Sequence, residues 1–487
     1  MLFHTFQFLL FFPIVVLVTF AIPVRARNLW LLIASYFFYM CWHAGYAVLL
    51  ATSTAVTYAG GRLIEQTRNG KIKKAFLATS LVINLGILFY FKYFNFAIGL
   101  MNLLFSKIGI SIHVPLFDIL LPVGISFYIF QALGYLIDVY RGDVRAEKNL
   151  LRYALFVSFF PQLVAGPIER SKNLLGQMAF AKTFEYDRIR SGLLTMLWGY
   201  FLKVVIADRC AVLVDTVYAA YDSYMGYQII TANIAFAIQI YCDFMGYSTI
   251  AKGAAQVLGY ELMDNFHQPY FAVSIKDFWH RWHISLSSWL RDYVYFSLGG
   301  GINGKIKKYR NIMVTFLISG LWHGADVTFV LWGLMHGIYQ VVEEALSEPM
   351  GKLGAILKVR INTASWVWPR RLITFVFVDI AWVFFRASDV VEAVGVLRAS
   401  VHFGNIGDIL SQGGIYDLGL STLHMNILAL SMAVLFVVGI LCERGMKVLE
   451  WISSQTILFR YALYWGAIIL IILSMNITGK EFIYFQF

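Results

Sequence analysis

Long apolar runs recur along the whole chain, and they constrain its fold more than any other feature. A helix needs about 20 mostly apolar residues to cross the hydrocarbon core of a bilayer. Such segments lie at 3–22, 28–44, 46–61, 75–94, 119–139, 191–217, 229–260, 372–387, 423–442 and 458–477. The stretch 311–345 has the pattern of a helical hairpin, and 152–168 and 390–403 are weaker candidates. We therefore predict an all-α integral membrane protein with about 11 transmembrane helices.

Basic clusters alternate with loops that lack Lys and Arg along this series of segments. Lys and Arg cluster at 25–27, 62–74, 141–152, 170–190, 305–310, 352–371 and 444–447, whereas the loops 43–46, 218–228 and 404–422 contain neither. Because cytoplasmic loops of membrane proteins concentrate Lys and Arg, the alternation predicts cytoplasmic clusters and an extracytoplasmic N-terminus. Topology thus accounts for most of the net charge of +11, and we expect no nucleic-acid partner.

Residues 152–168 break the alternation, because basic clusters flank them on both sides. They also contain Pro161, Gly166 and Pro167. Irregular backbone at membrane depth must be sheltered by protein or water, so we predict a re-entrant or buried broken helix. Only 14% of the residues are charged, which is too few to cover several soluble domains. We expect one multi-span domain over residues 1–487.

Ionisable residues inside apolar segments are informative, because each costs at least ~2.5–3.5 kcal/mol to insert into hydrocarbon. Six lie in or near these segments: Asp138, Lys203, Asp208, Arg209, Asp243 and Lys252. One interpretation is an intramembrane ion pair or hydrogen bond between helices. The other is a polar wall of a substrate cavity. We favour structural support for Asp138 and Asp208, and both interpretations stand for Asp243.

The segment 274–304 has an amphipathic pattern. Large apolar side chains recur in it at helical spacing, at Phe278, Trp282, Leu286, Trp289 and Tyr293. Polar side chains fall on another face, at Arg281, Ser285, Ser288 and Asp292. This pattern predicts a helix that lies at the membrane interface, with the aromatic stripe as a surface anchor. Four serines and two histidines in 274–293 exceed the needs of an anchor, so we expect the helix also to border a site.

His323 lies in the motif Ser-Gly-Leu-Trp-His-Gly (319–324), between two apolar runs. A lone histidine in such a place is by default a hydrogen-bonded packing residue. Here Gly320 and Gly324 leave room for another backbone or a ligand. Burial favours the neutral imidazole, which can act as a general base toward a hydroxyl group. His336, thirteen residues further on, is either a second polar wall or a helix contact, and we favour the contact.

Several familiar catalytic motifs are absent from the sequence. It contains no Gly-x-Ser-x-Gly nucleophile elbow and no His-Glu-x-x-His zinc pair. The four cysteines are far apart and form no Cys-x-x-Cys motif, so we predict neither a disulfide framework nor a metal site. A catalyst of this composition would use a buried histidine and substrate positioning instead.

The sequence resembles the membrane-bound O-acyltransferase family, and within it the bacterial branch of alginate O-acetylation, peptidoglycan O-acetylation and D-alanyl transfer. The resemblance is carried by the segments 28–39, 121–127, 135–142, 160–167, 243–248, 278–293, 320–324, 384–387 and 482–485. The Trp-His-Ile-Ser segment at 282–285 followed by Trp-His-Gly at 322–324 is the most specific combination. The resemblance implies spans and interfacial helices in a ring around a central funnel.

The resemblance also implies a site and a reaction. The invariant histidine of the family matches His323, and a second pocket histidine matches His283. The implied reaction is transfer of an acyl group, most simply acetyl, from a cytoplasmic thioester to a hydroxyl presented from the other side of the membrane. Further candidate contacts to substrate or donor are Trp282, Ser285, Arg281, Arg291, Trp322, Asp243 and His336.

No tightly bound cofactor is implied, and the co-substrate would be an acyl thioester, either acetyl-CoA or an acyl-carrier protein. The implied location is the bacterial cytoplasmic (inner) membrane. Membrane lipid, an extracytoplasmic acetyltransferase or polysaccharide-modification protein, and an acyl-carrier protein are the expected partners. Two rival hypotheses remain: a transporter or channel without chemistry, and a membrane scaffold. In a transporter the same buried polar residues would line a permeation path, and flux would occur without consumption of an acyl thioester. A scaffold needs no buried His323, whereas an acyltransferase does.

Overall fold

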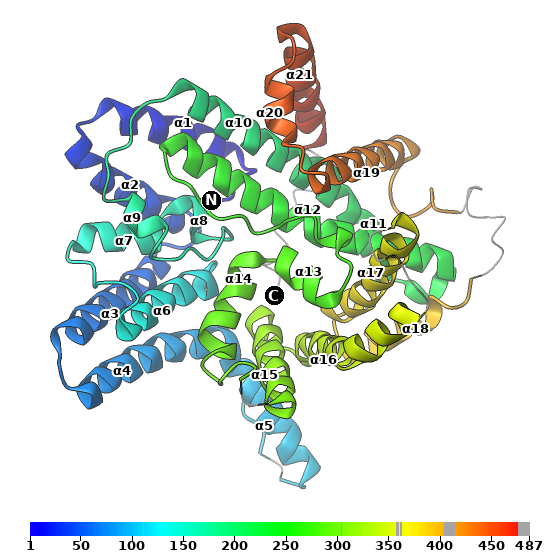
Figure 1. Ribbon diagram of the computed structural model, residues 1–487, viewed down its shortest axis with the longest axis horizontal. Helices are drawn as coiled ribbons and strands as arrows, with labels where there is room; N and C mark the ends of the chain where they lie inside the picture. The colour runs from blue at the N-terminus through cyan, green and yellow to red at the C-terminus, as the bar shows by residue number, and fades with distance from the viewer. Residues whose placement is uncertain (111, 303, 357–359, 361–362, 404–413, 476–487) are drawn as a thin grey trace. The chain divides into compact units, whose positions relative to one another are not determined.

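A computed structural model describes residues 1–110, 112–302, 304–356, 360, 363–403 and 414–475. Every regular element within these ranges is a helix (Figure 1), which confirms the all-α prediction. The motif at 482–485 and most of the loop 404–422 lie outside the described residues. The chain forms two compact units: unit 1 comprises Met1–Met196 with Ile250–Met263, and unit 2 comprises Leu197–Thr249 with Asp264–Phe487. A single domain over the whole chain stays a prediction.

Five helical stretches of the described chain are long and apolar enough to cross a bilayer: Tyr46–Gln66, Gly70–Lys107, Gly226–Leu258, Thr422–Glu443 and Ile457–Ser474. Large apolar side chains lie exposed on several of them, for example Leu458 and Leu473. Such exposure suits helices whose neighbours are lipid chains. The structure is therefore that of a multi-pass membrane protein, while the predicted total of about 11 spans stays a prediction.

Unit 1 is built mainly from the N-terminal helices. They are α1 Phe6–Ala21, α2 Val24–Met40, α3 Tyr46–Gln66, α4 Gly70–Leu88, η1 Phe89–Tyr93, α5 Phe94–Lys107, α6 Ile125–Arg141, α7 Leu150–Ser158, α8 Phe160–Leu163, α9 Leu174–Gln177 and the first part of α10 Tyr186–Tyr200. Helix α4 starts where the side chain of Asn69 accepts a hydrogen bond from the backbone N–H of Lys71. Helices α4, η1 and α5 follow one another without a gap.

The helix break predicted in 152–168 is present. Helix α7 ends at Ser158, and Pro161 occupies the first turn of the short helix α8. The carbonyl oxygen of Phe156 accepts hydrogen bonds from the side chains of Gln131, at 2.6 Å, and Gln162, at 2.9 Å. Two buried amides therefore satisfy a carbonyl group near the break, as a buried irregular backbone requires.

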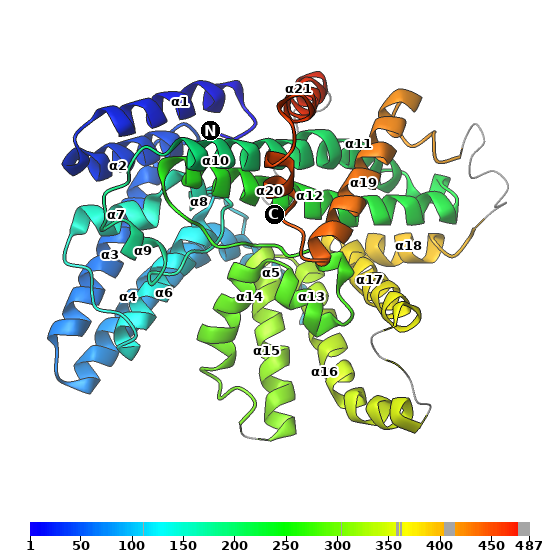
Figure 2. The ribbon, with the colours of Figure 1, turned by 45° about the horizontal axis from the view of Figure 1, so that its top comes forward.

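Unit 2 contains the remaining helices. They are the last part of α10, η2 Phe201–Ala207, α11 Asp208–Tyr218, η3 Tyr221–Ser223, most of α12 Gly226–Leu258, η4 Pro269–Phe271, α13 Ile275–Arg281, α14 Ile284–Leu290, η5 Arg291–Tyr295, α15 Lys305–His323, α16 Val327–Ile356, α17 Ala364–Arg386, α18 Val390–Ala399, α19 Thr422–Glu443, α20 Val448–Ser453 and α21 Ile457–Ser474. Helices α15 and α16 form the hairpin predicted for 311–345 and pack closely on each other (Figures 1 and 2).

The prediction of one interfacial helix over 274–304 is wrong. Helix α13 ends at Arg281, and a new helix, α14, begins at Ile284. His283 between them has a left-handed backbone conformation, with φ 43° and ψ 53°, which no continuous helix contains. The predicted surface anchor is wrong as well, because the aromatic stripe is buried: Trp282 is 0% exposed and Tyr293 8%. The stripe packs against protein instead of facing a membrane surface.

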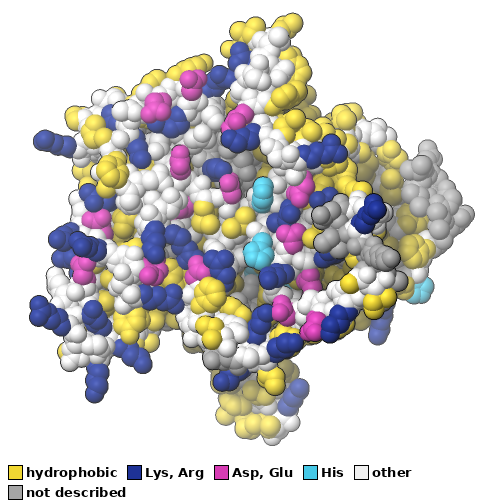
Figure 3. All heavy atoms as spheres, viewed as in Figure 1, with side chains coloured by type: hydrophobic (Ala, Val, Ile, Leu, Met, Phe, Trp, Pro, Cys, Tyr) yellow, Lys and Arg dark blue, Asp and Glu magenta, His cyan; other side chains and the backbone are white. Residues whose placement is uncertain are grey.

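The face shown in Figure 3 carries charged side chains of both signs over the region of α13. Some of these charges pair with one another. Arg281 at the end of α13 forms ion pairs with Asp277, at 2.8 Å, and with Glu443 at the end of α19, at 2.7 Å. Arg371 on α17 is the second partner of Glu443, at 3.3 Å. This network joins three helices of unit 2 beside the interrupted segment.

Candidate active site

His323 is the last residue of α15, at the joint of the α15–α16 hairpin (Figure 2). Helix α15 ends here because Gly324 adopts an extended conformation. Helix α16 starts nearby, where the carboxylate of Asp326 accepts a hydrogen bond from the backbone N–H of Thr328 at 2.8 Å. The turn is short, and His323 remains 3% exposed. The joint therefore holds a buried imidazole between two helices.

Two glycines determine how closely these helices approach. A Cβ atom on Gly320 would lie 2.3 Å from the carbonyl oxygen of Phe329 on α16. A Cβ atom on Gly333 would lie 2.4 Å from the carbonyl oxygen of Phe316 on α15. The two backbones can approach so closely only because these positions carry no side chain, as in other close helix pairs in membranes. Gly320 thus serves backbone packing, the first of the two uses that the sequence allowed, whereas a Cβ atom on Gly324 would meet the ring of Phe329.

Aromatic rings surround the imidazole of His323. The rings of Trp322 and Trp332 have their centroids 4.9 Å from it, and that of Phe385 on α17 lies 5.4 Å away. Their interplanar angles lie between 73° and 86°, which is an edge-to-face arrangement. These rings keep bulk water from the histidine and hold its orientation.

His283 lies next to His323, with 6.3 Å between the ring centroids. The His283 ring also packs edge-on against Phe244 of α12, at 4.6 Å, and against Trp322, at 5.6 Å. It is fully buried, and burial lowers the pKa of this imidazole, which lies outside the candidate spans, to about 3. His283 is therefore neutral at physiological pH. The structure brings together the two histidines that the sequence placed forty residues apart.

Asn265 holds the backbone on which His283 is mounted. Its carbonyl oxygen accepts a hydrogen bond from Ile284 N–H at 2.9 Å, and its side-chain oxygen accepts one from Ser285 N–H at 3.3 Å. Its amide group donates to the hydroxyl of Ser248 on α12, at 3.1 Å. A left-handed conformation at a residue other than glycine is unfavourable and persists only where its surroundings enforce it. Asn265 is a main part of those surroundings.

His336 lies deeper in the aromatic packing of α16. Its Nδ1 accepts a hydrogen bond from the indole N–H of Trp279 at 3.3 Å, which assigns the remaining proton to Nε2. Trp332 packs on it at 5.0 Å, and on His323 at 4.9 Å. The favoured prediction for His336 was a helix contact, and its contacts are of that kind.

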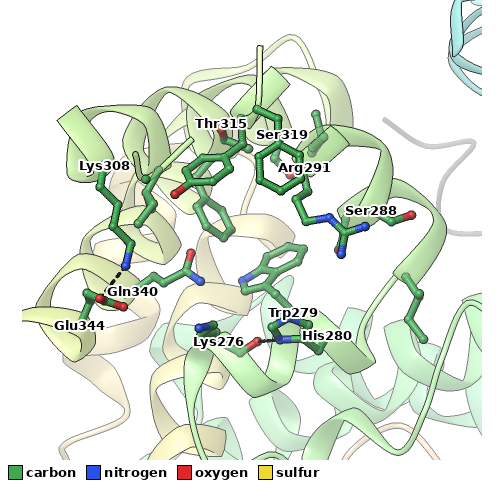
Figure 4. A pocket seen from close by; sticks show the side chains of 18 residues that line it. Lys276, Trp279, His280, Ser288, Arg291, Lys308, Thr315, Ser319, Gln340 and Glu344 are labelled. Carbon is green, nitrogen blue, oxygen red and sulfur yellow. Dashed lines mark hydrogen bonds and ion pairs between the residues drawn. The ribbon is translucent and has the colours of Figure 1, made fainter. Parts of the chain in front are cut away.

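A cavity of about 510 Å³ opens beside this cluster, entirely within unit 2 (Figure 4). Five elements contribute to it: α13, α14, η5, α15 and α16. Its lining consists of Lys276, Trp279, His280, Ile284, Ser287, Ser288, Leu290, Arg291, Tyr295, Phe296, Gly301, Lys308, Ile312, Thr315, Phe316, Ser319, Gln340 and Glu344. The lining residue Ile284 directly follows His283, and the rings of Trp279 and Phe316 pack on His336 with centroids 5.1 and 6.3 Å from it. The cavity therefore borders the histidine cluster, although neither His283 nor His323 is part of its lining.

The cavity combines an apolar wall with a positive charge balance. Lys276, Arg291 and Lys308 contribute three cations, and Glu344 is the only carboxylate in the lining. Glu344 pairs with Lys308 at 2.6 Å. The lining therefore carries two more formal positive than negative charges. An elongated, mostly apolar ligand with an anionic end matches this distribution.

The remaining predicted site residues differ in position. Arg291 lines the cavity and pairs with Asp292, at 2.8 Å, whereas Arg281 is outside the lining and held by its own ion pairs. Trp282 stacks on Phe278 at 5.5 Å, within the core. Ser285 is buried, and its carbonyl oxygen accepts a hydrogen bond from the hydroxyl of Ser288 at 3.0 Å. Of these four predicted residues, Arg291 alone belongs to the cavity lining.

Asp243 forms a buried ion pair, which was one of its two interpretations. Lys203 on the π-helical segment η2 contacts it at 2.7 Å and contacts Asp208 at 3.0 Å. All three residues are buried. The next residue, Phe244, packs on His283. Asp243 therefore supports the helix behind His283 without lining the described cavity.

Sequence reasoning missed Lys276, Lys308 and the hydroxyl of Ser319 as parts of the cavity. A signal for Ser319 was present: Asn311, Thr315, Ser319 and His323 recur every four residues along one face of α15. Lys276 and Lys308 had no comparable signal, because cytoplasmic basic clusters are common in membrane proteins.

Comparisons with known proteins bear on this site. The sequence model of MBOAT, the membrane-bound O-acyltransferase family, matches residues 143–385. That range includes both histidines and the whole cavity lining. Four of the nine segments that carried the resemblance lie entirely inside the matched region: 160–167, 243–248, 278–293 and 320–324.

Three relatives represent the range of similarity. The chain is 41% identical over 396 residues to the probable alginate O-acetylase AlgI of Pseudomonas aeruginosa, which covers 81% of this chain and 74% of that protein. It is 35% identical over 438 residues to the peptidoglycan O-acetyltransferase of Helicobacter pylori, covering 83% and 81%. It is 28% identical over 240 residues to the teichoic acid D-alanyltransferase of Bacillus subtilis, covering 46% and 60%. These matches confirm the resemblance inferred from the motifs: the chain belongs to the membrane-bound O-acyltransferase family, whose activity is O-acyl transfer.

Proposed function

We propose that this protein transfers an acetyl group from a thioester donor to a hydroxyl group of an envelope or exported polysaccharide, with His323 as the general base. The observation that carries the proposal is the pair of buried imidazoles, His283 and His323, at the edge of a cavity with a cationic lining. The similarity to the alginate O-acetylase and the peptidoglycan O-acetyltransferase supports acetyl as the group and a polysaccharide as the acceptor.

The proposed reaction is a direct transfer. His323 removes the proton of the acceptor hydroxyl while its oxygen attacks the thioester carbonyl carbon. A carbon–oxygen bond forms, the carbon–sulfur bond breaks, and the proton held by His323 passes to the departing thiolate. His283 remains neutral and orients the acyl group. The aromatic rings around His323 exclude water, which would otherwise hydrolyse the thioester.

The donor is proposed to occupy the described cavity. Acetyl-CoA and a carrier-protein thioester share a pantetheine arm that ends in a phosphate group. Lys276, Arg291 and Lys308 supply the positive charge for that phosphate, and Trp279 and Phe316 supply the apolar wall for the arm. In this proposal the donor enters from the cytoplasm, the acceptor lies on the other side, and the N-terminus is extracytoplasmic in a bacterial inner membrane. An extracytoplasmic polysaccharide-modification protein is the proposed partner.

The test uses a strain that lacks this gene and is complemented with single variants at matched membrane levels. Ester-linked acetate on the exported polymer is measured by mass spectrometry. We expect His323→Ala to abolish acetylation and His283→Ala to lower it at least tenfold. His402→Ala changes an exposed histidine and serves as the matched control. Full acetylation with His323→Ala would refute the proposed role of His323.

A transporter without chemistry predicts a different result. Membrane vesicles that contain the wild-type protein and an acceptor polysaccharide should release thiol from an added acetyl thioester, and the same vesicles with His323→Ala should not. Flux of a saccharide with no His323-dependent release of thiol would favour the transporter. The same variant therefore separates the two functions.

A further inference from the structure

Ser319 has a buried hydroxyl group that the fold leaves unused. The side chain lies on α15, one helical turn before His323, and is 1% exposed. Its oxygen has no hydrogen-bond partner among the residues that the structure describes. A buried hydroxyl without a partner is uncommon in folded proteins, and it requires an explanation.

Other hydroxyl groups on apolar helices of this chain bond to their own backbone. The hydroxyl of Thr315 donates to the carbonyl oxygen of Asn311 at 2.7 Å. Thr216 and Ser35 do the same with the residues four positions earlier, at 2.8 and 2.7 Å. This bond is available to almost any serine or threonine in a helix. Ser319 does not make it, although Thr315 lies four positions earlier on the same face.

Among the lining residues on α15, Ser319 is the one closest to His323 along the helix. Ser319 lines the cavity, and His323 is four residues further along the same face of α15, a rise of roughly 6 Å. In Figure 4, Thr315 and Ser319 lie together at the edge opposite Lys276 and His280. An arm that extends from the basic residues toward His323 would thus bring its reactive end past Ser319.

We propose that the hydroxyl of Ser319 donates a hydrogen bond to the carbonyl oxygen of the acyl thioester. The inference rests on the proposed function. As the acceptor oxygen attacks, the carbonyl oxygen becomes an oxyanion, and a fixed O–H donor stabilises this charge. When the carbon–sulfur bond breaks, the carbonyl re-forms and keeps the hydrogen bond. His323 accepts the proton of the acceptor hydroxyl, and Ser319 stabilises the negative charge on the carbonyl oxygen. The two side chains lie on successive turns of α15.

The test compares Ser319→Ala with Ser431→Ala in membrane vesicles, with acetyl-CoA as the probe and thiol release as the measured rate. Ser431 is 3% exposed, lies on α19 and is not in the cavity lining, so the substitution and the burial are matched. Removal of one oxyanion donor lowers kcat by about 10²–10³-fold in other enzymes, and we expect a loss in that range for Ser319→Ala. The KM for acetyl-CoA should stay within about threefold, because the contact strengthens only in the transition state.

Two further variants complete the design. Ser319→Thr keeps the hydroxyl, so its kcat should be at least tenfold higher than that of Ser319→Ala. If altered packing caused the loss in Ser319→Ala, Ser319→Thr would show an equal or larger loss of kcat. A kcat for Ser319→Ala within threefold of wild type, or a change in KM alone, would overturn the inference. If the wild-type protein releases no more thiol than His323→Ala, the proposed function itself is refuted, and this result does not depend on any Ser319 variant.

Discussion

The contact between Gly320 and α16 allows a quantitative prediction for Gly320→Ala. The added Cβ would lie 2.3 Å from the carbonyl oxygen of Phe329, whereas an ordinary contact begins at 3.4 Å. The obstacle is backbone on a neighbouring helix, so no side-chain rotation can relieve it. Helices α15 and α16 must therefore separate by roughly 1 Å at this point. His323, three residues further on, moves with α15.

The expected effect has two parts. Overpacking of this kind destabilises proteins by about 1–3 kcal/mol, and the higher helix propensity of alanine offsets up to ~1 kcal/mol of it. With the full offset, we therefore expect a net loss of about 0–2 kcal/mol. A displacement of about 1 Å at a catalytic group can lower the rate about 10²-fold. Activity should thus fall far more than the amount of folded protein.

Thermal unfolding in detergent and acetyl transfer in vesicles measure the two parts separately. Gly86→Ala on α4 is the control, because a Cβ at that exposed position meets nothing within 4 Å. We expect it to be neutral or slightly stabilising and fully active. If Gly320→Ala matched wild type in both melting temperature and rate, the close approach of α15 and α16 would not be what positions His323.

Three further predictions concern other parts of the chain. Lys203→Met should lower stability by about 3–5 kcal/mol, because it leaves two buried aspartates without their cation, and immunoblots of membranes should show little protein. Asn265→Ala removes the side-chain acceptor that fixes the backbone of His283, so kcat should fall at least tenfold at unchanged protein level; unaltered kcat would exclude this positioning role. Burial raises the pKa of Glu169 from 4.5 to about 7. With rising pH, the carboxyl group therefore loses its proton in the unfolded chain before it does so in the folded protein. The free energy of unfolding should decline from about pH 4.5 to 7 and then level off. Melting curves across this range should show the decline in wild type and a weaker one in Glu169→Gln.

Sequence patterns predicted the helices well where local information determines them. Apolar runs predicted the five long apolar helices of the described residues, the short turn after His323 predicted the hairpin, and Pro161 predicted the helix break. The pairing of His323 with His283 came from family motifs, because no periodicity relates two residues forty positions apart. These features depend on residues that are close in sequence or on a recognisable motif.

Other features depend on contacts between distant segments and were not predictable. The spacing of aromatic residues continues through Trp282 and His283, so a single helix was the natural expectation. The interruption instead depends on hydrogen bonds from Asn265 to the backbone after His283. Similarly, the role of Arg281 depends on Glu443, which lies 162 residues away. The prediction that the aromatic stripe faces the membrane surface is wrong for the same reason. Its burial depends on how the helices pack together.

The uninterrupted run of α4, η1 and α5 has a consequence for the surrounding lipid. Helix α4 has 19 residues and α5 has 14, so they measure roughly 28 and 21 Å along their axes, compared with the ~30 Å of a hydrocarbon core. Figure 1 shows that the two helices run in different directions on either side of the π-helical segment η1, and π-helical turns are a common cause of helix bends. A bent pair of this kind adapts to the thickness of the bilayer by changing the tilt of its two helices. Membrane thickness is thus a physical variable to which unit 1 must respond, and short-chain and long-chain lipids should favour different inclinations of this pair.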